Sequence, residues 1–346
     1  MNTVDVPVER LLTPSRAKSY SACPRKHHYA YTLGVRSASN GSTATRFGTA
    51  AHAAIEAYWR ERAAGTDLVV DDDGHALLWP SVNRALADHF DVLGEEQWVK
   101  LRALIELYCA SWNERAVEVL AVEREFQMPL LHPRSRKQHP YYWLGGKIDL
   151  LVRLEDGRVA LIDHKTTSSD PGAGSDYRRR LLLDPQPTIY VAGCETFGHS
   201  VDLILYDVLV KPGQERLLAT PTEKRKYTKD GKLYASQREH DESADDFDQR
   251  IRTAVFGAPA DYFVSFEVPK PAAELNAVQA NLWAIASELL RVAELGFARQ
   301  NAGACFDYGG CEYLPVCTRE ASIDDARLYV RVGPSPELTE AARTAA

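Results

Sequence analysis

The sequence predicts an α/β fold in which helices flank a mixed β-sheet. Two observations on its 346 residues support this prediction. Up to residue 115 the apolar side chains recur at the helical period, and beyond it short runs rich in β-branched and aromatic residues take over. A turn signal joins two of these runs, and a helical stretch separates the last two. The sheet should therefore hold both antiparallel and parallel neighbours.

Residues 1–115 are expected to form a helical N-terminal region. Thr13 and Pro14 are the residue types of a helix N-cap and first helical position, and Pro24 ends this short helix. A longer helix spans "RFGTAAHAAIEAYWRERAAG" and stops at Gly65. Its apolar side carries Ala51, Ile55, Tyr58 and Trp59. Helical character then continues to the end of the region.

Residues 116–270 are expected to form the sheet-containing core. The tripeptide "EDG" between two β-rich runs predicts a hairpin. The segment "DPQPTIYVAGCETFG" precedes the last run and predicts a crossover helix, which makes the strands on either side of it parallel. A polar, turn-rich and exposed loop is expected over residues 211–243. The β-rich runs themselves are residues 119–131, 141–155, 157–167 and 200–211.

The last part of the chain is expected to pack against this core. Residues 271–330 should hold one long helix, residues 272–296, and a segment that contains cysteines. Residues 331–346 are expected to be a poorly ordered tail. We expect all four regions to form one integrated globular unit.

Charge and composition restrict the partners that the chain could bind. A formal net charge of −7 argues against binding a polyanion over the whole surface, so nucleic acid would need local basic groups. No apolar stretch is long enough to span a bilayer and no secretory signal is evident, so we expect no membrane contact and a cytoplasmic location. The candidate DNA-binding residues, each of which could instead be a solvated surface charge, are Arg25, Lys26, Arg178, Arg179, Arg180, Lys224, Arg225 and Lys226.

Two aspartates mark the predicted hairpin as a candidate metal site. Asp149 and Asp163 lie on its two strands, and paired carboxylates repel each other unless a cation such as Mg²⁺ or Mn²⁺ separates them. Lys165 follows Asp163 at the strand period of two, so both side chains point to one face. An ammonium there can stabilise developing negative charge or orient a water. The alternative is that all three are ordinary strand-end residues.

Four cysteines form a second candidate site. Cys305, Cys311 and Cys317 are spaced C-x5-C-x5-C, and Cys23 lies near the other end of the chain. Thiols in a reducing compartment rarely form disulfides, so this set suggests an iron–sulfur cluster or a zinc ion, with unliganded cysteines as the alternative. The other two cysteines, Cys109 and Cys194, lie in apolar helical pattern and should be core residues.

The stretch "GGKIDLLVRLEDGRVALIDHKTT" resembles the core motif of the PD-(D/E)XK nuclease superfamily. The resemblance is to its RecB-like branch, which includes CRISPR-associated single-strand exonucleases and many phage exonucleases. Three further stretches are similar to motifs of that branch: "FGTAAHAAIE", "QPTIY" and "LTPSRAKSYSACPRKHHY". The resemblance covers the chain from about Leu11 to Cys317.

This resemblance implies a restriction-endonuclease-like fold and assigns roles by position. It implies that His52, Asp149, Asp163 and the backbone carbonyl of His164 bind Mg²⁺ or Mn²⁺, and that Lys165 is the catalytic lysine. Gln186 and Tyr190 would hold the site or the DNA strand, and the side chain of His164 has no assigned chemistry. Glu56, one turn after His52, is interpreted either as an orienter of that histidine or as a solvated glutamate.

The same resemblance implies that one N-terminal and three C-terminal cysteines ligate a structural 4Fe-4S cluster. These would be Cys23, Cys305, Cys311 and Cys317, with Zn²⁺ as the alternative ligand. In the branch's other members the C-terminal cysteines are often more closely spaced at first.

The function that these motifs predict is that of a metal-dependent DNA exonuclease. Its substrate would be single-stranded DNA or DNA ends, and a helicase or other DNA-processing protein is the partner that the resemblance suggests. Two other functions stay open. One is a non-catalytic DNA-binding or scaffold subunit of a helicase–nuclease complex, and the other is an RNA or defence endonuclease with the same core.

Overall fold

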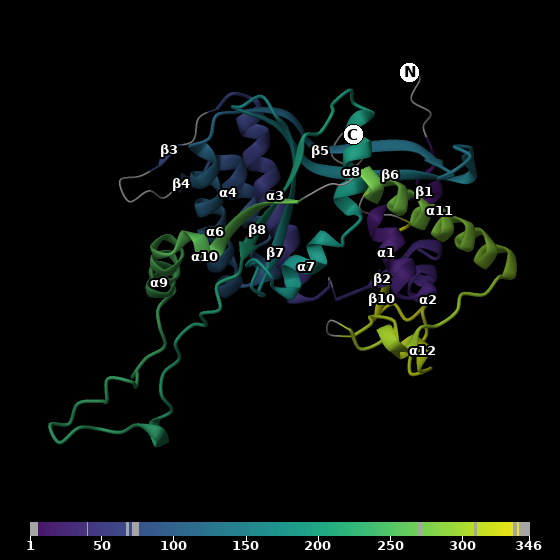
Figure 1. Ribbon diagram of the computed structural model, residues 1–346. Coiled ribbons are helices and arrows are strands. Elements are labelled where there is room, and N and C mark those ends of the chain that lie inside the picture. Colours follow the sequence, from purple (N-terminus) through teal and green to yellow (C-terminus); the bar gives the residue numbers. More distant parts are fainter. Residues whose placement is uncertain are drawn as a thin grey trace.

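A computed structural model describes residues 6–39, 41–66, 69–70, 76–268, 272–307, 310–334 and 338. Its central sheet is mixed, as the sequence predicts (Figure 1). The strands of this sheet are β1 (Leu11–Leu12), β5 (Val117–Leu131), β6 (Gln138–Leu154), β7 (Val159–Thr167), β8 (Leu203–Val210) and β9 (Phe263–Val268). Strand β6 pairs antiparallel with β5 and β7, β8 is parallel to β7, and β9 is antiparallel to β8.

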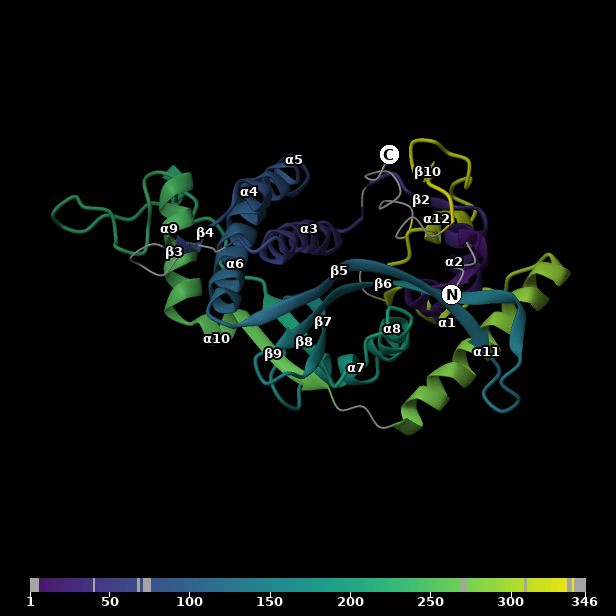
Figure 2. The same ribbon diagram turned by 90° about the horizontal axis from the view of Figure 1, so that it is seen from above.

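Helices cover both faces of this sheet (Figure 2). They are α1 (Pro14–Ala22), α2 (Pro24–His27), α3 (Thr43–Ala63), α4 (Pro80–Ala87), α5 (Phe90–Leu93), α6 (Glu95–Asn113), α7 (Asp176–Leu182), α8 (Gln186–Glu195), α9 (Ala244–Gly257), α10 (Pro259–Tyr262), α11 (Ala272–Leu295) and α12 (Leu314–Cys317). The pairs β2 (Val35–Ser37) with β10 (Tyr329–Arg331) and β3 (Val69–Val70) with β4 (Ala76–Leu77) form two small sheets. Single turns complete the chain at Val8–Arg10, His28–Thr32, Thr222–Lys224 and Ala302–Ala304.

The predicted helix signals are confirmed. The side chain of Thr13 accepts a hydrogen bond from the backbone N–H of Arg16, so it caps α1, and Pro14 occupies the first helical position. Helix α3 begins three residues before the predicted segment, where Ser42 caps it by accepting from the N–H of Thr45. Its predicted apolar side is buried in full: Ala51, Ile55, Tyr58 and Trp59.

The hairpin and the crossover are also confirmed. The N–H of Gly157 donates to the carbonyl of Leu154 and closes the turn between β6 and β7. Gly157 has a φ of 85°, a conformation that glycine adopts without strain. Helix α8 then crosses over the sheet, and β8 returns parallel to β7 in register with Asp163 opposite Tyr206.

Two hydrophobic cores lie on opposite faces of the sheet. One packs α3, α4, α6 and α9 against the sheet, and the other packs α1, α8 and α11 against its opposite face. The predicted core cysteines Cys109 and Cys194 are fully buried, one in each core. Both faces of the central strands are therefore apolar, as expected for a covered mixed sheet.

Strand β6 changes face at Asp149. Ile148 packs in the α8 core, whereas Leu150, two residues later, packs in the α3 core, although residues two apart on a regular strand share one face. Strand β6 also changes partner here, because β1 pairs with it at residues 143–144 and β7 only from Leu150 onward. Between the residues that pair with β1 and those that pair with β7, strand β6 borders a cleft. Asp149 lies at the edge of that cleft.

The two ends of the chain meet in a separate small core. Tyr31, Val35, Tyr313 and Tyr329 are buried together there, and the Tyr313 hydroxyl donates to the carbonyl of Val35 over 2.6 Å. Most of the predicted tail lies outside the described residues, although Arg331 at its start pairs with Val35. None of the helices in the described part of the chain is long and apolar enough to cross a membrane.

Candidate active site

Asp149 and Asp163 lie side by side where the ladder between β6 and β7 ends. The last regular pair is Leu150 with Ile162, so the two aspartates occupy the next opposing positions. The backbone N–H of His164 donates to Oδ2 of Asp149 over 2.9 Å. The hairpin therefore brings the two carboxylates together, as the sequence predicts, and fixes one of them by a main-chain bond.

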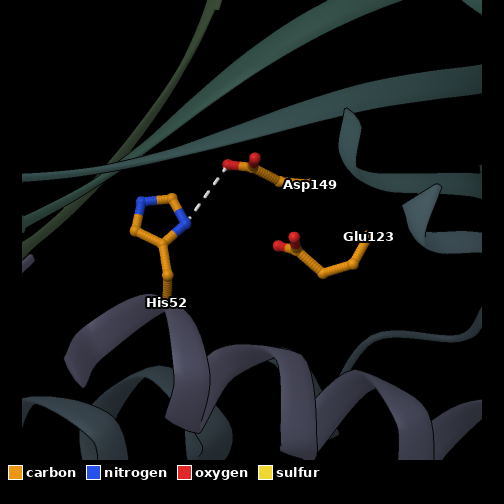
Figure 3. A group of neighbouring side chains, drawn as sticks. All are labelled: His52, Glu123 and Asp149. Atoms are coloured by element: carbon orange, nitrogen blue, oxygen red, sulfur yellow. Dashed lines mark ion pairs between the residues drawn. The ribbon is translucent and has the colours of Figure 1, made fainter. Parts of the chain in front are cut away.

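His52 reaches the same point from α3 (Figure 3). Its Nδ1 lies 3.6 Å from Oδ2 of Asp149. Burial lowers the pKa of His52 despite the opposing charge of Asp149, so the imidazole is neutral at pH 7 and its lone pair is available to a metal ion. His52 and Asp149 are therefore two neighbouring candidate metal ligands and not an ion pair at this pH.

Glu123 is a third side chain in this group, and the interpretation of the sequence missed it. Val122 pairs with Leu150 and Arg124 with Ile148, so Glu123 lies opposite Asp149 on β5. Its φ of 46° is rare for a residue with a side chain and marks a local distortion of the strand. Regular pairing outward from the β5–β6 turn, where Leu131 pairs with Gln138, would have placed Glu123 opposite Gly146. A register shift between Pro129 and Leu131 brings Glu123 opposite Asp149 instead, and neither this shift nor the positive φ has a sequence signal.

The donor atoms of His52, Glu123 and Asp149 fit a divalent metal. One ligand atom from each residue lies within 4.8 Å of the other two, and this is the one such group of histidine, cysteine or acidic residues in the part of the chain that the structure describes. Two carboxylates and one imidazole suit Mg²⁺ or Mn²⁺. Figure 3 shows all three side chains directed at one space between α3 and the β5–β6 ribbon.

Asp163 belongs to a second network beside this group. Its Oδ2 lies 2.5 Å from Nζ of Lys165, and Nε2 of Gln186 donates to its Oδ1 over 2.9 Å. Gln186 also contacts the Tyr190 hydroxyl over 3.0 Å and the Lys165 ammonium over 3.4 Å. Gln186 therefore links the four side chains that the sequence groups as catalytic on β7 and α8: Asp163, Lys165, Gln186 and Tyr190.

Burial and neighbouring charges raise the pKa values of Asp163 and Glu123, and a bound cation would offset this effect. Burial raises the pKa of Asp163 to about 6, with Lys165 opposing the increase and Asp149 adding to it. Burial and the charge of Asp149 likewise raise the pKa of Glu123 to about 7, against the effect of Lys147, whose Nζ lies 2.5 Å away. A bound cation would favour the ionised carboxylates and offset this penalty.

The ammonium of Lys165 keeps its charge in this surrounding. Burial opposes the charged form, but the carboxylates of Asp163 and Asp149 raise the pKa of Lys165 above its ordinary value. Lys165 is about a quarter exposed, so part of its side chain reaches solvent. It is placed to act on a group that enters from solvent.

Packing against Phe126 holds α8 beside the sheet. A Cβ added at Gly146 would lie 2.9 Å from the Phe126 ring, and one added at Gly193 would lie 2.6 Å from it. Only glycine therefore lets the ring sit between β6 and α8. The same added atom at Gly146 would meet Tyr190 at 3.0 Å, so this packing also positions the Gln186–Tyr190 pair.

His164 points away from Asp163, as expected for consecutive residues of a strand. Its Nε2 lies 2.7 Å from the hydroxyl of Tyr108 on α6, and that hydroxyl accepts from Nε1 of Trp59 on α3. Its Nδ1 nevertheless lies 3.6 Å from Oδ2 of Asp149. The ring therefore supports Asp149 from the core side. Glu56 pairs with Arg60 over 2.6 Å, so its carboxylate is engaged on the helix surface rather than with His52.

His52, Glu123 and Asp149 line a cavity of about 580 Å³, and Asp163, Lys165 and Gln186 lie beside it, outside its lining. Its walls come from α3, from the β5–β6 ribbon and from the start of α1 at residues 13–15, with Leu338 at one side. The candidate metal group lies on this wall together with Tyr190. The cleft is therefore bounded on more than one side by protein.

Several of the basic residues that the sequence singles out already have protein partners. Arg25 donates to the carbonyl of Ala298 and to Gln300, and the guanidinium of Arg178 lies 4.0 Å from the centre of the Phe266 ring. Arg179 pairs with Asp176 over 3.2 Å. Lys26 lines the cysteine cavity described next.

The four cysteines that the sequence groups together line one cavity of about 410 Å³: Cys23, Cys305, Cys311 and Cys317. Backbone bonds hold the two ends of the chain here, because the N–H of Arg25 donates to the carbonyl of Arg299 and Asn301 donates to the carbonyl of Ala22. The N–H of Asn301 also approaches Sγ of Cys23 at 3.4 Å. We call this space the cysteine cavity.

Comparison with known proteins identifies a family and finds similar solved structures. A family model described as the PD-(D/E)XK nuclease superfamily matches residues 11–318. No curated protein matches the chain. A solved structure described as "Crystal structure of SSO0001" is similar over 92% of this chain and 90% of its own, with 12% sequence identity and a TM-score of 0.37.

Proposed function

Because this chain belongs to the PD-(D/E)XK nuclease superfamily, which implies metal-dependent nuclease activity, we propose that it is a DNA exonuclease. Its substrate would be single-stranded DNA or the ends of DNA. One observation supports this proposal above the others. His52, Glu123 and Asp149 form a nitrogen and oxygen donor group on one cavity, and the charge of Lys165 acts on Asp149 from beside it.

We assign the binding of Mg²⁺ or Mn²⁺ to His52, Glu123 and Asp149. From the family motif we add Asp163 and the backbone carbonyl of His164 as further ligands. The ion, when bound, supplies Lewis-acid activation of a water and of the scissile phosphate. Glu123 broadens the ligand set that the sequence motifs suggest.

The remaining residues of the cleft would orient the reacting groups. The Lys165 ammonium would stabilise negative charge that develops on the phosphate or align the attacking water. Gln186 holds the Asp163 carboxylate by one hydrogen bond and is itself held by Tyr190, so both act as positioning residues. A substrate strand held between α1, α3 and the β5–β6 ribbon would present its phosphate to this group.

The exonuclease assignment rests on the RecB-like motifs, and the shape of the cleft is compatible with it. Walls from α1, α3 and the ribbon border the candidate metal group, where a strand could be held. A helicase or other DNA-processing partner and a cytoplasmic location stay predictions of the sequence.

We further propose that the cysteine cavity holds a 4Fe-4S cluster. Four thiols on one cavity supply the number of ligands that such a cluster needs. Four thiolates can also bind a zinc ion, which is the alternative occupant of this cavity. The cluster would join the two ends of the chain and take no part in hydrolysis.

The proposed reaction can be tested with end-labelled single-stranded DNA in Mg²⁺ or Mn²⁺. Lys165→Met should abolish hydrolysis, and Lys137→Met on the exposed turn between β5 and β6 should retain it as a matched control. Full activity in Lys165→Met would refute the assignment.

A circular single strand of the same sequence tests the exonuclease assignment separately. The linear strand should be degraded and the circle should resist. If both disappear at equal rates, the protein is an endonuclease, and the metal-dependent nuclease assignment still stands.

A further inference from the structure

The chain leaves the body of the protein between β8 and α9 as a long arm (Figures 1 and 2). Both views show residues 211–243 projecting beyond the sheet and its helices. The sequence predicts a polar, exposed loop here and includes Lys224, Arg225 and Lys226 among its candidate DNA-binding residues. We call residues 224–234 the arm tip. Its structure and composition indicate a binding surface separate from the cleft.

Buried and charged contacts fix the base of the arm. Glu242 is buried, accepts two hydrogen bonds of 2.7 Å from Arg250 and accepts a third from the N–H of Leu217. Hydrogen bonding from Arg250 lowers the pKa of Glu242 to about 2, so this contact persists at neutral pH. Arg216 pairs with Glu95 on α6 over 2.7 Å. The arm is therefore attached to α6 and α9 at both of its ends.

Hydrogen bonds within the arm also order its tip. The N–H of Thr228 donates to the carbonyl of Lys232 over 2.7 Å, and the N–H of Tyr234 donates to the carbonyl of Lys226 over 3.1 Å. Gln237 bridges the two sides, because it accepts from the N–H of Lys226 and donates to the carbonyl of Lys224. Less conformational entropy would thus be lost when the tip binds a partner.

The tip is positive although the protein as a whole is negative. It carries four lysines and Arg225 against one acidic residue, Asp230, so its net charge is +5 − 1 = +4, compared with −7 for the whole chain. Arg225 donates to the carbonyls of Thr220 and Glu239 and supports the fold of the arm. In the described part of the chain no ion pair involves the other four: Lys224, Lys226, Lys229 and Lys232. Their charges face solvent.

Two large aromatic rings are exposed among these lysines. Tyr227 is 54% exposed and Tyr234 is 46% exposed. Exposed rings beside ammonium groups suit a strand whose bases stack on the rings while its phosphates contact the lysines. A purely acidic protein partner would account for the lysines but not for the two rings, and a duplex would keep its bases out of reach of them.

We propose that the arm tip binds single-stranded nucleic acid at a distance from the cleavage site. This inference rests on the proposed nuclease function, because it describes where a longer substrate strand is held. The arm begins at the sheet edge from which Lys165 projects, since Val208 pairs with Lys165 and the arm starts three residues later. From there to Tyr227 the chain can span at most about 55 Å. The arm tip should therefore bind only strands that are long enough to reach it from the cleft, and shorter strands should bind at the cleft alone.

Binding is tested in the background of Asp163→Asn, so that the strand survives the measurement. Fluorescein-labelled single-stranded DNA of about 40 nucleotides serves as the long probe and of about 8 nucleotides as the short one. Replacing the four lysines with glutamine should weaken binding of the long probe tenfold or more and reduce the slope of log K against log salt by about 3. The short probe should bind unchanged.

Tyrosine variants test the stacking contribution by itself. Tyr227→Leu with Tyr234→Leu should weaken binding of the long strand by about tenfold per ring without changing the salt slope, whereas the two Tyr→Phe replacements should retain it. As a matched charge control, Arg134→Gln with Lys137→Gln on the exposed β5–β6 turn should have little effect. Circular dichroism confirms that each variant is folded.

The outcomes separate this inference from the proposed function. Unchanged binding of the long strand in the lysine and tyrosine variants would overturn the inference, as would equal loss for the short and long probes. Stronger binding of a blunt duplex than of the single strand would also overturn it. Hydrolysis of the short strand depends on the cleft alone and is measured with an intact Asp163, in the arm variants and in the unmodified protein. Absence of this hydrolysis in the unmodified protein would refute the proposed function rather than this inference.

Discussion

The acidic cleft and the cysteine cavity both gather side chains from distant parts of the chain, but different structures hold them. In the cleft, Asp149 and Asp163 lie on paired strands of a sheet that is covered on both faces. In the cavity, Cys23 lies between two short helices, Cys305 follows a single turn, Cys311 lies in a loop and Cys317 ends the short helix α12. The cleft is therefore built on the central sheet, whereas the cavity is built from short helices and loops.

Because of this difference, substitutions at the two sites should have different consequences. Loss of a side chain in the cleft should impair chemistry and leave the fold intact, because hydrogen bonds and packing of the sheet remain. Loss of a thiol should loosen the contact between the chain ends, because the remaining contact there consists of hydrogen bonds from residues 22–25 to residues 298–301 and of the small core around Tyr313. The following changes can test that contrast.

The largest effect is expected for Asp163→Asn. The amide keeps the shape of the carboxylate but loses its charge toward Lys165, so kcat/KM on linear single-stranded DNA should fall at least about a hundredfold. The midpoint of thermal unfolding should stay within a few degrees. Asp176→Asn, at an exposed carboxylate of α7, is the matched control and should change neither quantity.

Cys23→Ser should have the opposite profile. The thermal midpoint should fall by roughly ten degrees, and visible absorption from a cluster should disappear, since structural metal binding contributes directly to folding. Cys194→Ala, at a buried thiol outside the cavity, should lower the midpoint less and keep the absorption. An unchanged midpoint in Cys23→Ser would contradict the structural role of the cavity.

The pH dependence of stability should reveal the acidic cleft in the metal-free protein. The pKa of Glu123 is raised to about 7 and that of Asp163 to about 6, so their contribution to stability is complete below pH 4 and is lost as pH rises through 6 to 7. Unfolding in urea with EDTA should show a loss on the order of 6 kcal/mol between about pH 4 and pH 8. Mn²⁺ should reduce this loss, and Glu123→Gln should remove part of it.

Gly146→Ala should disturb the cleft through packing alone. The added methyl group would press on Phe126 and Tyr190 and should destabilise the protein by about 1 to 3 kcal/mol, with a moderate loss of activity as Gln186 shifts. Gly213→Ala has open space around its Cβ and serves as the control. Equal stability of the two variants in chemical denaturation would argue against the packing role of Phe126.

Tyr108→Phe should have the smallest effect of this set. It leaves the Trp59 indole and the His164 ring without their shared hydroxyl and should lower stability by about 1 to 2 kcal/mol. Activity should fall severalfold because His164 supports Asp149. Tyr58→Phe removes, from the same core, a hydroxyl that does not contact His164. This variant should lower stability and leave kcat unchanged.

The fold and much of the cleft could be predicted from the sequence because local signals agree with the tertiary structure. Thr13 and Pro14 cap a helix, the turn at Gly157 makes a hairpin, and that hairpin alone brings Asp149 beside Asp163. Lys165 follows from the strand period. These are short-range consequences of backbone geometry, and the structure confirms the arrangement.

Other features depend on contacts that the sequence does not encode locally. Glu123 enters the cleft because β5 distorts at a positive φ opposite Asp149, and no residue type marks that distortion. His164 reaches Tyr108 only because α6 packs on one face of β7. The order of the arm likewise depends on Glu242 meeting Arg250 of α9, which composition alone does not predict.

The contrast between the two sites depends above all on the acidic cleft holding a divalent metal independently of the cysteine cavity. Titration with Mn²⁺, followed by the decrease of the free-ion electron paramagnetic resonance signal, measures this binding without any need for hydrolysis. The unmodified protein should bind Mn²⁺, and Asp149→Asn should lower that affinity by more than about tenfold, whereas Cys317→Ser should retain it. Undiminished Mn²⁺ binding in Asp149→Asn would contradict the assignment of the metal site.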